Sequence, residues 1–222
     1  MSLATALNLA IVTPFKQSWT PIMWKMRGKP DEAVFHTKTM TYYSLVQVFV
    51  LCGVAVFADL GMFLLSGGKP EFIAMALVVP LLYLGTIFFG KYDVMSAVCF
   101  EGKTHYYTIS VFASAACSVL LNILLIPRLG LWGCAVAYAC SNFVFAMLSR
   151  RFGKRFFSVS FEWGKVTVGW VLGAVALGVG LLARQAGGAL GFAVGFVVLA
   201  LLAFALTRLI ERSEFQQFRE LF

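Results

Sequence analysis

The chain alternates between long apolar runs and short connectors that hold most of its charged residues. Each run has 18 to 24 residues, close to the roughly 20 residues with which an α-helix crosses a bilayer. The runs are continuous rather than alternating, so they predict helices and not the strands of a membrane barrel. We expect seven membrane-spanning helices, at Leu3–Trp24, Tyr42–Leu65, Phe72–Gly90, Tyr106–Ile126, Leu131–Leu148, Val166–Ala183 and Ala189–Ile210.

These runs predict an all-α fold, a polytopic membrane helix bundle that occupies residues 1–210. The remaining residues, 211–222, place Phe215, Phe218 and Phe222 at helical spacing among charged and polar residues. That pattern indicates a short amphipathic helix lying on the cytoplasmic membrane surface.

The basic residues divide unequally between alternate connectors. Of the 18 Lys and Arg residues, 14 fall in the connectors of one side, three in those of the other, and Lys16 lies within a predicted helix. Because basic loops stay in the cytoplasm, the richer side and the C-terminus are predicted to be cytoplasmic, and the first helix enters from outside. Complete bacterial transporters commonly begin and end in the cytoplasm, so an odd count leads us to expect the back portion of a longer protein.

Composition supports a membrane location. Hydrophobic residues make up 60% of the 222 residues and charged residues only 13%, against about 25% charged residues in soluble domains. The net charge of +8 does not predict nucleic-acid binding, because the basic residues interrupt apolar blocks and form no patch.

Side chains suited to catalysis or metal binding are scarce. The five cysteines lie in apolar stretches without a CxxC pair, which indicates neither a disulfide framework nor a zinc site. We interpret His36 and His105 as isolated, with no second His or carboxylate at ligand spacing, so no metal is expected. The predicted membrane segments hold no Ser/His/Asp set and no close carboxylate pair. We therefore expect neither an enzyme nor a cofactor.

Away from the ends of the predicted helices, two charged residues fall inside them, and such residues are candidates for function. Asp59 lies about six residues from the outer end of its helix, which favours a hydrated aspartate at the membrane interface over a cation or proton site. Lys16 lies between Pro14 and Pro21 in the middle of the first run.

At about 100° per residue, Thr13, Lys16 and Thr20 form a polar stripe along one helix face, with Gln17 beside it. One interpretation is a lysine whose long chain reaches the cytoplasmic headgroups. The other is a helix that lines a water-filled cavity, where Lys16 would meet an anionic substrate. On the second interpretation the candidate substrate-binding residues are Lys16, Gln17, Thr13, Thr20 and Asn122.

Small residues recur every four positions in several predicted helices, which lets helix backbones approach closely in a membrane. We expect these stripes to be packing faces; a seam along which helices slide is the alternative. The stripes are Ser110/Ser114/Ser118 running on to Asn122, Gly133/Ala137/Ser141, Gly169/Gly173, and Gly187/Gly191/Gly195.

Three segments resemble bacterial polysaccharide flippases. The run LNILLIPRLGLWGCAVA at residues 121–137 is similar to that family's LNxLLIPxxGxxGAAxA segment, with Cys134 departing from it. The run FKQSWTP at residues 15–21 is similar to a helix end written FxxAWxP. Lys103 and Thr104 fit the end of a KKT sequence whose first lysine is replaced by Gly102.

The resemblance implies the multidrug/oligosaccharidyl-lipid/polysaccharide exporter superfamily, whose members have 12 or 14 helices in two lobes around a central cavity. This chain would match the last seven helices of a 14-helix member and would need an N-terminal lobe as its partner. Its substrate would be a polyprenyl-pyrophosphate-linked oligosaccharide, moved across the bacterial inner membrane by alternating access. Alternatives are a multidrug or toxin cation antiporter of the same superfamily, a membrane-embedded glycosyltransferase or ligase, and a structural subunit.

Overall fold

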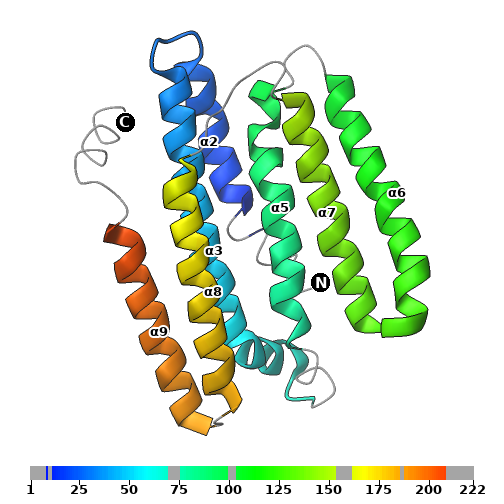
Figure 1. The fold of residues 1–222 in the computed structure, drawn as a ribbon, viewed down its shortest axis with the longest axis vertical. Coiled ribbons are helices and arrows are strands. Elements are labelled where there is room, and N and C mark those ends of the chain that lie inside the picture. Colours follow the sequence, from blue (N-terminus) through cyan, green and yellow to red (C-terminus); the bar gives the residue numbers. More distant parts are fainter. Residues whose placement is uncertain are drawn as a thin grey trace. The chain divides into compact units, whose positions relative to one another are not determined.

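The computed structural model describes Leu9 and residues 12–69, 76–99, 104–153, 162–185 and 188–208. Within these ranges the chain is helical apart from short turns, and the seven helices follow the order of the seven predicted runs (Figure 1). They are α2 (Thr13–Met26), α3 (Glu32–Ser66), α5 (Val78–Cys99), α6 (Thr104–Leu129), α7 (Leu131–Gly153), α8 (Trp163–Gln185) and α9 (Gly188–Arg208). The predicted all-α class is confirmed.

Two helices extend beyond the predicted apolar runs, through polar residues that the prediction had assigned to connectors. α3 begins at Glu32 rather than at Tyr42, and α5 ends at Cys99 rather than at Gly90. The prediction followed hydropathy, which marks the part of a helix that suits lipid and not the helix itself. At about 1.5 Å per residue, α3 would be about 50 Å long, which exceeds the roughly 30 Å hydrocarbon core of a bilayer.

Within the described residues, three helices are long and apolar enough to cross a membrane: Glu32–Leu64, Thr104–Leu129 and Leu131–Gly153. Three shorter apolar helices cover Val78–Gly90, Gly164–Gly180 and Ala193–Arg208. The described part of the chain therefore has the character of a membrane helix bundle. That all seven helices cross the membrane stays a prediction, as does their orientation. The predicted surface helix at residues 211–222 lies outside the described residues.

One compact unit joins residues 1–37 with residues 58–160. Within it α7 lies between α5 and α6, and α2 packs against α5 (Figure 1). Rings interlock on both sides of α7, because Phe145 contacts Phe89 of α5 and Tyr107 of α6 at centroid distances of 4.8 and 5.7 Å. A Cβ on Gly85 of α5 would lie 2.7 Å from the Tyr138 ring, so the absence of a side chain there lets α5 and α7 approach.

The second unit joins residues 38–57, which are the central part of α3, with residues 161–222. Its core is formed by α3, α8 and α9, and its buried members are Leu45, Cys52, Ala176, Leu199, Leu202 and Leu206. The predicted glycine stripe of α8 is a packing face: Gly169 lies against Leu45, and Gly173 lies against Val48. The Cys52 thiol donates a hydrogen bond to the Gly173 carbonyl at 3.4 Å.

Candidate functional site

The polar stripe of α2 runs along the edge of its packed side. Val12, Trp19, Met23 and Met26 are buried and define that side. On a helical wheel with about 100° per residue, Lys16 lies within about 60° of the middle of this buried side. The Lys16 side chain is half-buried. Lys16 therefore lies on the side of α2 that contacts the protein.

Thr13 and Thr20 are half-buried beside Lys16, whereas Gln17 is exposed together with Pro14 and Pro21. The Thr20 hydroxyl donates a hydrogen bond to the Lys16 backbone carbonyl at 2.7 Å. Three of the four candidates on this helix are thus half-buried, and Gln17, about 40° from Thr13 around the helix, is exposed. Sequence spacing placed Gln17 beside the stripe but could not show which of these side chains are buried.

Asn122 lies on α6, which packs against α7, whereas α2 packs against α5. The Asn122 amide donates hydrogen bonds to the Ser118 carbonyl at 2.8 Å and the Ser118 hydroxyl at 3.3 Å. Its Oδ1 atom is buried and has no hydrogen-bond partner among the described residues. These contacts are local to α6 and do not bring Asn122 to Lys16.

Asp59, the other charged residue within a predicted span, is half-buried near the end of α3. It lies in the residues 58–66 that belong to the first unit.

A cluster of rings holds α2 against the start of α3. The Trp19 indole stacks with Phe15 and Phe35 at centroid distances of 6.2 and 5.4 Å. Its ring meets the His36 imidazole edge to face at 5.5 Å. Trp19 follows Lys16 by one turn, so this cluster sets the rotation of α2 where it carries Lys16.

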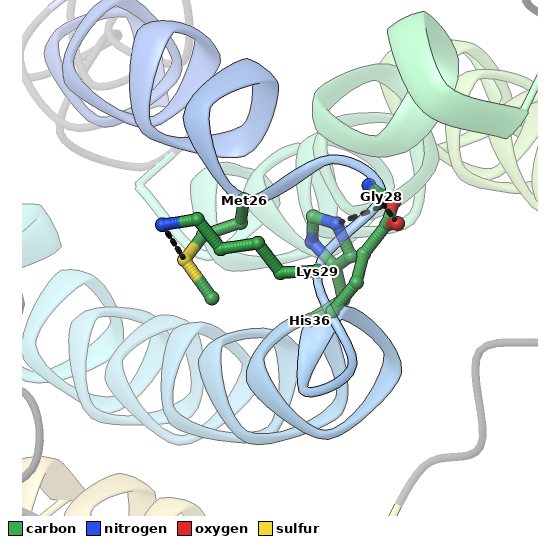
Figure 2. A network of polar contacts seen from close by, with 5 residues as sticks. Met26, Gly28, Lys29 and His36 are labelled. Carbon is green, nitrogen blue, oxygen red and sulfur yellow. Dashed lines mark hydrogen bonds and ion pairs between the residues drawn. The ribbon is translucent and has the colours of Figure 1, made fainter.

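The Glu32 carboxylate contacts both the turn between α2 and α3 and the ring cluster. His36 is therefore not isolated, and our interpretation of it was wrong. One Glu32 carboxylate oxygen accepts a hydrogen bond from the Gly28 N–H at 2.8 Å (Figure 2). The other lies 3.6 Å from Nε2 of His36, whose side chain is fully buried. Their separation by four residues is the spacing of neighbours on a helix face. The prediction missed this pair because it began the helix at Tyr42 and treated residue 36 as part of a loop.

The segment LNILLIPRLGLWGCAVA forms the turn between α6 and α7. Gly130 has a φ of +55°, and its N–H donates to the Ile126 carbonyl at 2.8 Å. A Cβ on Gly133 would lie 2.5 Å from the Leu125 carbonyl oxygen. The two glycines of the motif therefore make a tight helical hairpin, a structural role that requires no ligand.

The serine stripe of α6 is a packing face as expected. Ser110 is fully buried, and the Ser114 hydroxyl donates a hydrogen bond to the Ser141 carbonyl of α7 at 2.8 Å. Ala137 and Ser141 of the α7 stripe are buried too. Of the fourth stripe, Gly187 lies outside the described residues and Gly195 packs against Val56.

Within the described residues, no three His, Cys, Asp or Glu side chains form a group that could bind a metal ion. No protein-family model, curated protein or solved structure matches this chain.

Proposed function

We propose that this chain is one lobe of a transporter that moves a lipid-linked oligosaccharide across the bacterial inner membrane by alternating access. In this proposal Lys16 contacts the pyrophosphate of the carrier lipid. The observation that carries it is the position of Lys16, half-buried on the side of α2 that also holds Trp19 and Met23.

A lysine that serves only to reach the headgroups extends along the outside of its helix and needs no packed neighbours. Lys16 lies instead half-buried on the packed side of α2, and a charged residue within a membrane segment is a candidate for ligand binding. An anion bound by Lys16 would gain charge-assisted hydrogen bonds. This favours an anionic substrate over a cationic one.

Two features weaken α2 beside Lys16. Pro21 lies inside the helix and supplies no N–H for the carbonyl of Gln17, the residue four positions earlier. The Thr20 hydroxyl bonds the Lys16 carbonyl, a contact that often bends helices. A helix that bends next to a ligand is suited to alternating access, in which discontinuous helices form a site near the middle of the bilayer.

The resemblance of residues 15–21 and 121–137 to polysaccharide flippases supplies the substrate class. Lys16 is a cation that would attract an anion, and a polyprenyl pyrophosphate is an anion with a long apolar tail. The tail would stay in lipid while the polar headgroup crosses within the cavity.

Binding of undecaprenyl pyrophosphate to the purified chain in nanodiscs tests the proposal. Lys16→Arg is expected to keep most of the affinity. Lys16→Ala removes a charge-assisted hydrogen bond, which is worth roughly 1.5–3 kcal/mol or about 10- to 100-fold in affinity. Gln17→Ala is the matched control on the exposed face and is expected to change nothing.

Undecaprenol, which lacks the phosphates, distinguishes the lipid tail from the headgroup. Equal affinity of the wild-type chain for undecaprenol and its pyrophosphate would overturn the proposal. Preferential binding of tetraphenylphosphonium would favour the cation antiporter instead.

Flipping is tested in proteoliposomes that carry a fluorescent derivative of the same lipid. One lobe supplies one wall of the cavity, so the chain alone is expected to bind the lipid without flipping it. Flipping by the chain alone would contradict its assignment as a single lobe, unless it forms homodimers.

A further inference from the structure

The end of α2 carries a patch of exposed residues that we call the Trp24 patch; its members are Trp24, Lys25, Arg27 and Lys29. Trp24 is 44% exposed although it is a large aromatic residue. The patch combines one exposed aromatic ring with three exposed cations within six consecutive residues.

Trp24 and Arg27 form a pair at this surface. The Arg27 guanidinium carbon lies 5.2 Å from the centroid of the Trp24 ring, within the range of a cation–π interaction. An indole beside cations is suited to a membrane interface, because its ring prefers the headgroup region and its N–H can remain hydrated.

Backbone contacts hold the patch in one conformation. The N–H of Arg27 donates to the Trp24 carbonyl at 3.3 Å, and the N–H of Lys29 donates to the Met26 carbonyl at 3.2 Å. Gly28 between them has a φ of +75°, a conformation that glycine adopts without strain. The cations are therefore presented by an ordered turn, which lowers the entropy cost of binding.

The acidic residues of this turn do not cancel its charge. Glu32 directs one carboxylate oxygen to the Gly28 N–H at 2.8 Å and the other toward His36 at 3.6 Å (Figure 2). Its side chain is 16% exposed, whereas Lys25, Arg27 and Lys29 are all exposed. Asp31 is the one exposed acid of the turn, so positive charge remains in excess.

We propose that the Trp24 patch binds anionic phospholipid headgroups of the leaflet at which α2 ends. A membrane surface satisfies both of its features: the phosphates meet the cations, and the region below the headgroups accepts the exposed indole. A soluble anion would satisfy only the first. This binding is independent of the transport proposal.

Quenching of Trp24 fluorescence by brominated lipids tests the proposal. The four other tryptophans are replaced by phenylalanine, and the protein is reconstituted in brominated phosphatidylglycerol or brominated phosphatidylcholine. We expect phosphatidylglycerol to associate at Trp24 at least about threefold more strongly, because each basic residue near an anionic membrane adds to the attraction. The preference should fall toward equality in the triple variant Lys25→Gln, Arg27→Gln, Lys29→Gln, and also in 0.5 M salt, as screening requires.

Two controls separate specific binding from a general effect of charge. A protein retaining only Trp132, which is 48% exposed at the start of α7, should show no preference. Arg150→Gln with Arg151→Gln removes two charges at the end of α7 and should leave the Trp24 preference unchanged. Equal quenching of Trp24 by the two lipids, or a preference that survives the triple substitution, would overturn the proposal. Neither result depends on whether the chain binds undecaprenyl pyrophosphate.

Discussion

The indole of Trp19 and the imidazole of His36 meet edge to face, with ring centroids 5.5 Å apart and ring planes at 79°. This contact joins the last turns of α2 to the first turns of α3 across the turn at residues 27–31. Both side chains are buried, with exposures of 4% and 0%. The rotation of α2, and with it the side on which Lys16 lies, thus depends on residues that carry none of the predicted substrate contacts.

Trp19→Ala is expected to lower the free energy of unfolding by about 3 kcal/mol, because it removes a buried ring on which three other rings pack. Trp19→Phe should cost less than about 1.5 kcal/mol, since the buried Trp19 Nε1 has no hydrogen-bond partner among the described residues. Trp24→Ala, at an exposed position, is the control and should stay within about 0.5 kcal/mol. Unfolding in mixed micelles measures all three, and equal costs for Trp19→Ala and Trp24→Ala would contradict the packing described above.

Gly173→Ala is expected to destabilise the second unit by roughly 1–3 kcal/mol through overpacking, because its new Cβ would run into Cγ1 of Val48. Val48→Ala removes that methyl group and leaves a Cβ 3.8 Å away, an ordinary van der Waals contact. The variant that carries both Gly173→Ala and Val48→Ala should therefore lose less free energy of unfolding than the sum of the two single losses, by at least about 0.5 kcal/mol.

Gly178→Ala provides the matched control on the same helix. A Cβ there would meet nothing within 4 Å, so the substitution should be neutral or stabilise the helix by up to about 1 kcal/mol. If Gly173→Ala behaved like Gly178→Ala, the close approach of α8 and α3 would be refuted.

The geometry of the chain around the α6–α7 turn predicts which of two glycine substitutions, Gly130→Ala or Gly133→Ala, destabilises the protein more. Gly130→Ala has open space around its Cβ but must keep a φ of +55°, which costs about 1–2 kcal/mol. Gly133→Ala should cost more, because its Cβ would lie 2.5 Å from the Leu125 carbonyl oxygen and the backbone of the turn would have to move. Gly130→Asn should recover part of the loss, since asparagine tolerates this conformation better than alanine. Thermal unfolding of the three variants checks the order, and the reverse order for Gly130→Ala and Gly133→Ala would contradict it.

Cysteine labelling tests the predicted orientation in a background without the five native cysteines. Arg128→Cys lies in the last turn of α6, where residue 128 is exposed, and is expected to react with an impermeant thiol reagent in intact cells. Lys29→Cys and Arg151→Cys, exposed at the opposite helix ends, should react only after the membrane is opened. The reverse pattern would invert the topology and remove the cytoplasmic assignment of the basic connectors.

The order and approximate extent of the helices could be predicted because each membrane helix satisfies its own backbone hydrogen bonds, so an apolar run of sufficient length specifies its own structure. The packing faces could be predicted for a related reason, since small residues at four-residue spacing allow close approach whichever neighbour fills the space. The stripe at Gly169 and Gly173 identified the face of α8 without identifying α3 as its neighbour.

The partners of the polar side chains depended on tertiary contacts. Lys16 and Gln17 are adjacent in sequence, yet one is half-buried and the other exposed, because the packed side of α2 is set by Trp19, Met23 and the helices around them. Asn122 was grouped with Lys16 in the predicted site, but its amide donates a hydrogen bond to the Ser118 carbonyl within α6.

The sequence by itself thus determined an all-helical chain with seven helices in the described ranges, their packing faces and the asymmetry of charge between alternate connectors. Only the tertiary structure decided which edge of α2 is packed, that Glu32 bridges Gly28 and His36, and that Asn122 and Lys16 lie on helices with different neighbours. Helix formation depends on short-range backbone hydrogen bonds and hydropathy, which each segment carries alone. Burial of a side chain depends on which segments become neighbours, and no single segment carries that information.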